Sequence, residues 1–275
     1  MAKAIRQIKE QLKLVDLVIE VCDARIPRSS KNPDVDQIAQ GKMRLIVLAK
    51  ADLADPSVTE SWIDHYRAAG IEAVAADARN KRDIQAVVKQ ITALAKQKQE
   101  RDAKRGIRFR PLRALVAGIP NVGKSTLINT LSSRSVAKTG NRPGVTKGQQ
   151  WIKTGKEYEL LDTPGLLWPK FSGEQEGEHL AVIGTMPDAL ELMSTQAMAD
   201  TILAYGMQAW PRRLEEDYGI TEQTDPQEML VRIAEAIHAR KSGDQPDTDK
   251  AALVLIDRFR KGQLGPVSLE TCDKI

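Results

Sequence analysis

The sequence contains few cysteines, few aromatic residues and no long apolar run. Its 275 residues include 2 Cys, 4 Trp, 4 Tyr and 3 Phe. Two cysteines are too few for a disulfide framework or a structural zinc site, which favours a reducing cytoplasm. No stretch approaches about 18 uninterrupted apolar residues, so no membrane span is expected, and the N-terminus lacks the apolar run of a secretory signal. The scarcity of aromatic rings argues against a base-stacking surface for RNA.

The charge is distributed unevenly along the chain. Residues 1–179 carry 31 Lys and Arg against 21 Asp and Glu, whereas residues 180–275 carry 10 against 16. The first part therefore favours an acidic partner, and any contact with nucleic acid is expected to be made mostly with phosphates. The basic side chains are densest in a connector at residues 96–113, which has eight Lys or Arg and only two acidic residues.

Short apolar runs alternate with helical patterns in the first part of the chain. Strands are expected at Leu17–Cys22, Leu45–Leu48, Ala73–Ala75, Ala114–Ala117, Trp151–Lys153 and Tyr158–Leu161, and helices at 2–14, 56–69, 82–100 and from about Thr126. This alternation predicts an α/β fold with a doubly wound, mostly parallel sheet. We assign residues 1–175 to this domain.

The remainder of the chain, residues 180–275, predicts a separate small all-α domain. No convincing strand follows residue 180. Asp225 and Pro226 provide a helix N-cap and first turn, and a last helix ends at Gly262. The three histidines are predicted to be surface residues, His65 and His238 in helices and His179 in a loop.

One motif decides the class of function. Gly118–Thr126 reads GIPNVGKST and matches G-x-x-x-x-G-K-[ST] between a predicted strand and a predicted helix. Such a loop forms a concave row of backbone N–H groups that binds phosphate, and the glycines permit its close approach. Lys124 is the candidate charge for the β- and γ-phosphates, and Ser125 is a candidate Mg²⁺ ligand. Asn121, Val122, Gly123 and Thr126 complete the predicted phosphate site.

Two further segments fit the same chemistry. The segment Asp162-Thr163-Pro164-Gly165 comes directly after a predicted strand. At such a position the Asp162 carboxylate is expected near Mg²⁺, and the Gly165 N–H near the γ-phosphate. Between this segment and the phosphate loop lies Pro143-Gly144-Val145-Thr146. Its Thr146 hydroxyl is a candidate Mg²⁺ ligand in a loop that orders when the γ-phosphate is present. Lys124, Thr146 and Gly165 are therefore the predicted catalytic residues.

These motifs together resemble those of GTPases, but in a permuted order. Ala49-Lys50-Ala51-Asp52 is similar to the guanine-recognition motif N-K-x-D and precedes the phosphate loop by about seventy residues instead of following it. With the segments DARIP (Asp23–Pro27) and DTPGLLWPK (Asp162–Lys170), the chain resembles the circularly permuted ribosome biogenesis GTPase A family. The resemblance implies a cytoplasmic protein that binds GTP and GDP, hydrolyses GTP and acts in late maturation of the large (50S) ribosomal subunit.

The sequence departs from the family pattern at the base site and at the site of water attack. Ala49 replaces Asn, which weakens the base contact but leaves Asp52 to accept from guanine. Asp77 and Ala78 stand where the family has a purine-backing motif, and the Ala78 N–H is the candidate donor to guanine O6. Leu166 cannot orient the attacking water. The short segment at the family's usual start, whose histidine is a candidate for that task, is not in this sequence. We therefore expect slow turnover by the chain alone and stimulation by the large subunit.

Several alternatives follow from these departures. The protein is expected to be a monomeric GTPase that contacts ribosomal RNA phosphates and ribosomal proteins. A nucleotide-gated RNA-binding protein with little turnover, or an NTPase with relaxed base preference, are the competing interpretations. Asn121 is either a K⁺ ligand near the phosphates or a turn-forming residue.

Overall fold

The computed structural model describes residues 12–139, 151–154, 156–162, 173–185 and 193–272. The chain divides into two compact units. Residues Met1–Lys170 together with Glu270–Ile275 form the first, and Phe171–Leu269 form the second. Among the described residues, no helix has the length and apolar character needed to cross a membrane.

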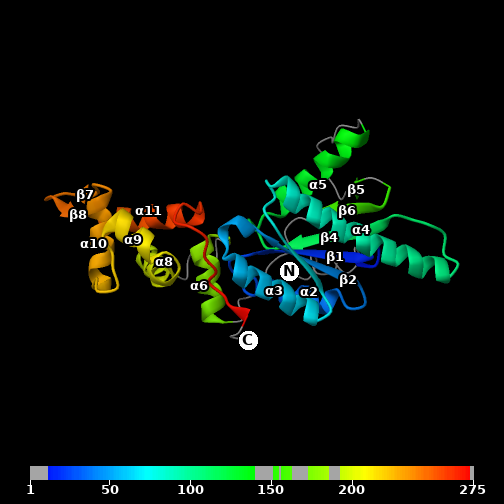
Figure 1. Ribbon diagram of the computed structural model, residues 1–275, viewed down its shortest axis with the longest axis horizontal. Helices are drawn as coiled ribbons and strands as arrows, with labels where there is room; N and C mark the ends of the chain where they lie inside the picture. Colours follow the sequence, from blue (N-terminus) through cyan, green and yellow to red (C-terminus); the bar gives the residue numbers. More distant parts are fainter. Residues whose placement is uncertain (1–11, 140–150, 155, 163–172, 186–192, 273–275) are drawn as a thin grey trace. The chain divides into compact units, whose positions relative to one another are not determined.

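The first unit is built on a six-stranded sheet (Figure 1). Its strands follow the order β3-β2-β1-β4-β6-β5, and all neighbouring pairs are parallel except β5 with β6. The strands are β1 (Leu17–Asp23), β2 (Met43–Ala49), β3 (Glu72–Ala76), β4 (Leu112–Gly118), β5 (Trp151–Lys153) and β6 (Tyr158–Asp162). The predicted α/β fold with a mostly parallel sheet is confirmed.

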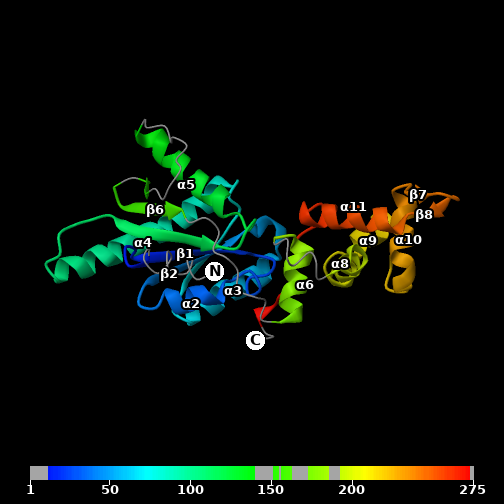
Figure 2. The ribbon, with the colours of Figure 1, turned by 180° about the vertical axis from the view of Figure 1, so that it is seen from behind.

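Helices cover both faces of this sheet, and its central strand is buried along its whole length. Every residue of β1 is buried, as expected for a parallel strand packed on two sides. Figures 1 and 2 show α2 and α3 on one face and α4 and α5 on the other. The elements are α2 (Pro33–Ile38), the short helix η1 (Ala51–Leu53), α3 (Pro56–Ala68), α4 (Lys81–Lys104) and α5 (Lys124–Thr139). Trp62 and Tyr66 of α3 pack with Cys22 and Ile46 in the core.

The parallel strands end at one common edge, where the polar loops of the sequence meet. Strand β1 ends at Asp23, β2 leads into Lys50 and β3 into Asp77, while β4 leads into the phosphate loop at Gly118. In open α/β sheets, ligands bind outside the carboxyl ends of the strands. The fold therefore gathers the predicted base and phosphate segments at the edge suited to binding a ligand.

The second unit is mainly helical. It contains α6 (Glu174–Ile183), α8 (Thr195–Ala209), α9 (Pro211–Tyr218), α10 (Pro226–Ala236) and α11 (Thr248–Arg260). Asp225 caps α10 as predicted, accepting from the Gln227 N–H. A small hairpin, β7 (Arg240–Lys241) with β8 (Gln245–Pro246), corrects the expectation that no strand follows residue 180. Its strands are only two residues long, which is too short to show the alternation of polar and apolar residues that predicts a strand.

Other expectations need adjustment. The predicted helix 2–14 lies almost entirely outside the described residues. Of the basic connector, Lys96 to Lys104 extend α4 and residues 112–113 begin β4, so only residues 105–111 form a loop. His65 is exposed, but His179 is buried inside α6, where its Nε2 lies 3.2 Å from Tyr205 Oη. His238 is exposed but follows α10 with a φ of +54° instead of lying in a helix.

Candidate nucleotide-binding site

The phosphate loop connects β4 to α5 and adopts backbone conformations that its sequence permits. Gly118 has φ +156°, and a Cβ there would lie 2.7 Å from the Val21 carbonyl oxygen. Gly123 has φ +107°, and Asn121 adopts the left-handed conformation with φ +57°. Val122 is fully buried and anchors the loop in the core. The loop is thus held close to β1, with glycine where a side chain would collide.

Helix α5 begins at Lys124, directly at the end of this loop. The Lys124 side chain is buried, and its ammonium group lies 3.4 Å from the Gly118 carbonyl oxygen, across the loop. Ser125 and Thr126 are exposed at the first turn of the helix. The first N–H groups of a helix have no partner within the helix and carry a partial positive charge. The ammonium group and these N–H groups together make an anion site.

The predicted base loop, Ala49–Asp52, begins at the end of β2. Ala49 is buried and its methyl group lies 3.6 Å from the position of a Cβ on Gly123. The Ala49 side chain is a methyl group without a hydrogen-bonding atom, and it packs under the phosphate loop. Asp52, in contrast, points a partly accessible carboxylate outward. Of the side chains in this segment, Asp52 is the acceptor suited to the N–H groups of a guanine.

Lys50 ties the base loop to the phosphate loop. It has the left-handed conformation, with φ 56° and ψ 38°. Its Nζ donates to the Asn121 carbonyl oxygen at 3.0 Å and lies 3.1 Å from Asp23 Oδ2. One ammonium group therefore links segments 71 residues apart in the chain. The link sets the distance between the predicted base loop and the phosphate loop.

Asp23 is the buried charge behind this link. Its carboxylate is fully buried and accepts from Arg25 Nε and Nη2, both at 2.9 Å. Burial alone would raise the pKa of Asp23, but the charges of Arg25 and Lys50 and the hydrogen bonds from Arg25 outweigh it and hold the pKa at about 2. Asp23 therefore stays ionised under Lys50 throughout the physiological range.

The loop after β3 carries the second part of the base site. The Asp77 N–H donates to Asp83 Oδ2 at 2.9 Å, and the Ala78 carbonyl accepts from Thr130 Oγ1 at 3.4 Å. Thr130 belongs to α5, so this loop is held against the helix that follows the phosphate loop. Arg79 donates from Nη2 to Asp52 Oδ2 at 2.6 Å. The structure thus brings together Ala49–Asp52, Asp77, Ala78 and Asn121–Thr126.

Three of the predicted residues are not placed in this way. Thr146 and Gly165 lie outside the described residues, as does Leu166. Asp162 ends β6, next to β4 in the sheet, with Val116 as its register partner. Its backbone therefore lies two residues short of the level of Gly118, at the same edge of the sheet.

Two structural contributors were missed by sequence reasoning. The role of Asp23 could have been predicted, because it is an acidic residue at the end of a buried strand, at the edge of the sheet where ligands bind. No sequence pattern pointed to Glu270. Its buried carboxylate accepts from the Arg28 N–H at 2.7 Å, from the Ser29 N–H at 3.1 Å and from the Ser29 hydroxyl, and so fastens the loop that follows Asp23. This contact spans 241 residues of sequence.

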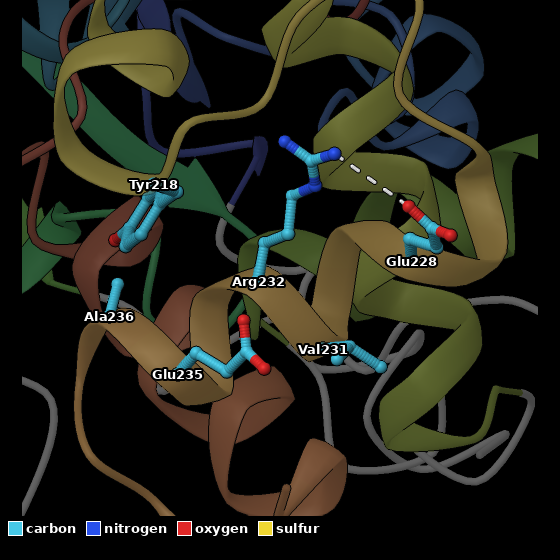
Figure 3. A pocket seen from close by; sticks show the side chains of 6 residues that line it. All are labelled: Tyr218, Glu228, Val231, Arg232, Glu235 and Ala236. Carbon is cyan, nitrogen blue, oxygen red and sulfur yellow. Dashed lines mark ion pairs between the residues drawn. The ribbon is translucent and has the colours of Figure 1, made fainter.

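The helical unit has a pocket of its own, which is lined by Tyr218, Glu228, Val231, Arg232, Glu235 and Ala236 (Figure 3). Arg232 pairs with Glu228 at 3.7 Å and donates to the Gly219 carbonyl at 2.6 Å. These contacts join α10 to the turn after α9. The arginine therefore has a structural role in the described unit, and the pocket contains none of the predicted nucleotide-binding residues.

Comparison with known proteins identifies the family of this chain. Residues 113–207 match a family model described as "50S ribosome-binding GTPase". Ribosome biogenesis GTPase A of Bacillus cereus is 44% identical, with 98% of this chain and 91% of the relative covered. The protein of the same name from Thermotoga maritima is 30% identical, covering 99% and 92%.

Solved structures give the same result. The GNP-bound YlqF of T. maritima superposes with a TM-score of 0.68 at 28% identity, covering 98% of each chain. A GDP-bound YlqF structure gives a TM-score of 0.69 at 26% identity, covering 97% of this chain and 99% of the other. Similarity at this level over nearly the full length shows that the chain belongs to the ribosome biogenesis GTPase A family.

Proposed function

We propose that this protein binds GTP, hydrolyses it to GDP and phosphate, and acts as an assembly factor for the large ribosomal subunit, in the cytoplasm and as a monomer. The observation that carries the nucleotide part is the Lys50 link, since it joins Asp23, the base loop and the phosphate loop through one ammonium group. The ribosomal part rests on family membership and on the description of the matching family model.

In this proposal each part of the site has one task. The backbone N–H groups of Asn121–Thr126 and the Lys124 ammonium hold the β- and γ-phosphates. Asp52 accepts from the N1–H and 2-amino groups of guanine, and the Ala78 N–H donates to O6. Lys50, held by Asp23, keeps these two halves at a fixed distance. A substrate held in one geometry loses its translational and rotational entropy when it binds. That loss therefore no longer adds to the barrier of the reaction step.

The residues near the phosphates also fit Mg²⁺, which favours hard oxygen ligands. Ser125 lies exposed at the first turn of α5, and Asp162 is the last residue of β6, the strand that pairs with β4. Together with Thr146 they are the proposed ligands. When bound, the ion neutralises charge that develops on the phosphate oxygens. The Gly165 N–H is proposed to contact the γ-phosphate.

The end of α4 and the loop after it are the proposed surface for ribosomal RNA. Lys104, Arg105 and Arg108 are exposed there, and Phe109 between the arginines has 63% of its surface accessible. Arg110 is engaged instead in a two-bond contact with Asp16 at 2.7 Å. Clustered, exposed cations favour phosphate contacts, whose strength falls steeply with salt.

The test is GTP turnover by the purified chain with and without large ribosomal subunits, with ATP as the control nucleotide. We expect slow turnover alone, since Leu166 cannot orient water, and strong stimulation by the subunit with GTP only. Subunit binding should weaken as a power of salt concentration. Tight binding without stimulation would favour a nucleotide-gated binding protein instead. Comparable turnover of ATP would favour an NTPase with relaxed base preference, which the buried methyl of Ala49 makes the relevant alternative.

A monovalent cation is proposed beside Asn121. This residue is exposed in the left-handed conformation within the phosphate loop. We expect faster GTP turnover in K⁺ than in Na⁺ at equal ionic strength, measured with subunits present. Asn121→Gly should remove the difference, since glycine keeps the positive φ without strain and lacks the side-chain oxygen. Equal rates of the unsubstituted protein in the two salts would exclude the ion.

A further inference from the structure

Two acidic residues follow neighbouring strands at the base site, and a single arginine lies between them. Ala49 and Ala76 are register partners in β2 and β3, so Asp52 and Asp77 follow those strand ends side by side. Arg79 donates from Nε to Asp77 Oδ1 at 3.0 Å and from Nη2 to Asp52 Oδ2 at 2.6 Å. The guanidinium group thus bridges two carboxylates that would otherwise repel each other.

The two ends of this bridge are held differently. Asp77 is fixed by the backbone: its N–H donates to Asp83, and its Oδ1 also accepts the Arg79 N–H at 2.9 Å. The hydrogen bond to Asp77 and the charges of both carboxylates raise the pKa of Arg79, so the bridge stays charged. Asp52 lies in the short helix η1, and its side chain is 31% accessible, against 20% for Asp77. Because Arg79 is bonded to both carboxylates, the position of Asp77 restricts the orientation of the Asp52 carboxylate.

The bridge leaves Asp52 able to bind a ligand. An ionised carboxylate has about four acceptor positions, and Arg79 is seen to use one of them on Oδ2. Two further donors in one plane, such as the N1–H and 2-amino groups of guanine, still find acceptors. The planar guanidinium group uses Nε on Asp77 and Nη2 on Asp52, so one rigid group sets the position of the Asp52 carboxylate relative to Asp77. The buried methyl side chain of Ala49 supplies no hydrogen bond to a base, so side-chain recognition of the base by this segment depends on how Asp52 is oriented.

We propose that Arg79 is a positioning residue for guanine specificity: it bridges Asp77 and Asp52 and holds the Asp52 carboxylate in the orientation that accepts the N1–H and 2-amino groups of the base. The inference rests on the proposed function, because it assumes that Asp52 reads guanine. Its energetic effect is modest, since 74% of the Arg79 side chain is accessible and exposed ion pairs contribute little. Its effect is on discrimination between bases.

The experiment compares GDP with IDP, which lacks the 2-amino group, by equilibrium titration of the full chain. We expect Arg79→Ala to lower the ratio of GDP to IDP affinity by about 2- to 5-fold. Arg79→Lys should recover part of it. Arg82→Ala, a nearby exposed arginine in α4, is the matched control and should leave the ratio unchanged. Tighter GDP binding by Arg79→Ala would overturn the proposal, because it would mean that Arg79 blocks the site.

A double substitution separates positioning from direct contact. If Arg79 acts through Asp52, Arg79→Ala should have no further effect on the GDP to IDP ratio in an Asp52→Asn background. A persisting effect would mean that Arg79 touches the base itself, and the proposal would be wrong. If Asp52→Asn alone leaves the GDP to IDP ratio unchanged, the assumption that Asp52 recognises guanine is wrong. If Asp52→Asn lowers the ratio and Arg79→Ala does not, only the role of Arg79 fails.

Discussion

Asp52→Asn is expected to weaken GTP binding by about 10- to 100-fold and to strengthen the binding of xanthosine triphosphate. In the proposed site the Asp52 carboxylate accepts two N–H groups of guanine, and a hydrogen bond to a charged group contributes about 1.5–3 kcal/mol. An asparagine amide in the same place accepts one N–H and donates to the 2-oxo group of xanthine. The measurement is the affinity for the two triphosphates, taken with the purified protein.

The matched control for this prediction is Asp64→Asn in α3, where the carboxylate is 72% accessible and pairs with Arg67 at 3.7 Å. That change removes one charge from the same unit and should leave both affinities unaltered. An unchanged preference for GTP over xanthosine triphosphate in Asp52→Asn would contradict the assignment of the base loop. It would also remove the assumption behind the role proposed for Arg79.

Asp23→Asn is expected to lower the free energy of unfolding by about 3–5 kcal/mol at pH 7, because it leaves the buried guanidinium of Arg25 without its counter-charge. Arg25 has only 2% of its side chain accessible, so water cannot replace the lost partner. Lys50 loses the same counter-charge. We therefore expect weaker nucleotide binding as well, since the phosphate loop and base loop are joined at this ammonium. Urea unfolding and GDP titration measure the two effects, with Asp64→Asn again as control.

The pH dependence gives this prediction a second test. The pKa of Asp23 is about 2 in the folded protein and near its ordinary value of 3.8 in the unfolded chain. Its contribution to stability is therefore fully present above about pH 4 and is lost as the pH falls through the folded pKa. The gap in unfolding free energy between the parent and Asp23→Asn should stay constant from pH 7 to about pH 5 and narrow below that. A gap that widens on acidification would contradict the ionised state of Asp23.

Much of this candidate site could be predicted because each of its segments is a short, continuous stretch of sequence. The phosphate loop depends on glycines and a lysine within nine residues, and the base loop on four, so each is visible as a short pattern next to an apolar run. The parallel sheet was likewise visible, since its strands are buried on both faces. Local patterns decide these features, and no distant contact is needed to recognise them.

The connections between the parts were not predictable in the same way. Whether Lys50 reaches the Asn121 carbonyl, or Arg79 reaches Asp52, depends on how loops meet after folding, which periodicity does not record. His179 shows the same limit. A histidine after a glutamate-rich turn resembles a surface residue, but α6 turns it inward to Tyr205. The β7–β8 hairpin was missed because its polar strands are two residues long.

The return of Glu270 to the first unit makes the helical unit an insertion in the topological sense. Residues 171–269 leave the nucleotide-binding unit and the chain then re-enters it, where Glu270 also accepts the Trp62 indole N–H at its carbonyl, 3.2 Å away. During synthesis the residue that fastens the loop after Asp23 is made only after the whole helical unit has been made. A nascent chain that ends before Glu270 contains the phosphate loop but not the carboxylate that holds the loop after Asp23. The nucleotide-binding unit is therefore completed only after the helical unit has been synthesised.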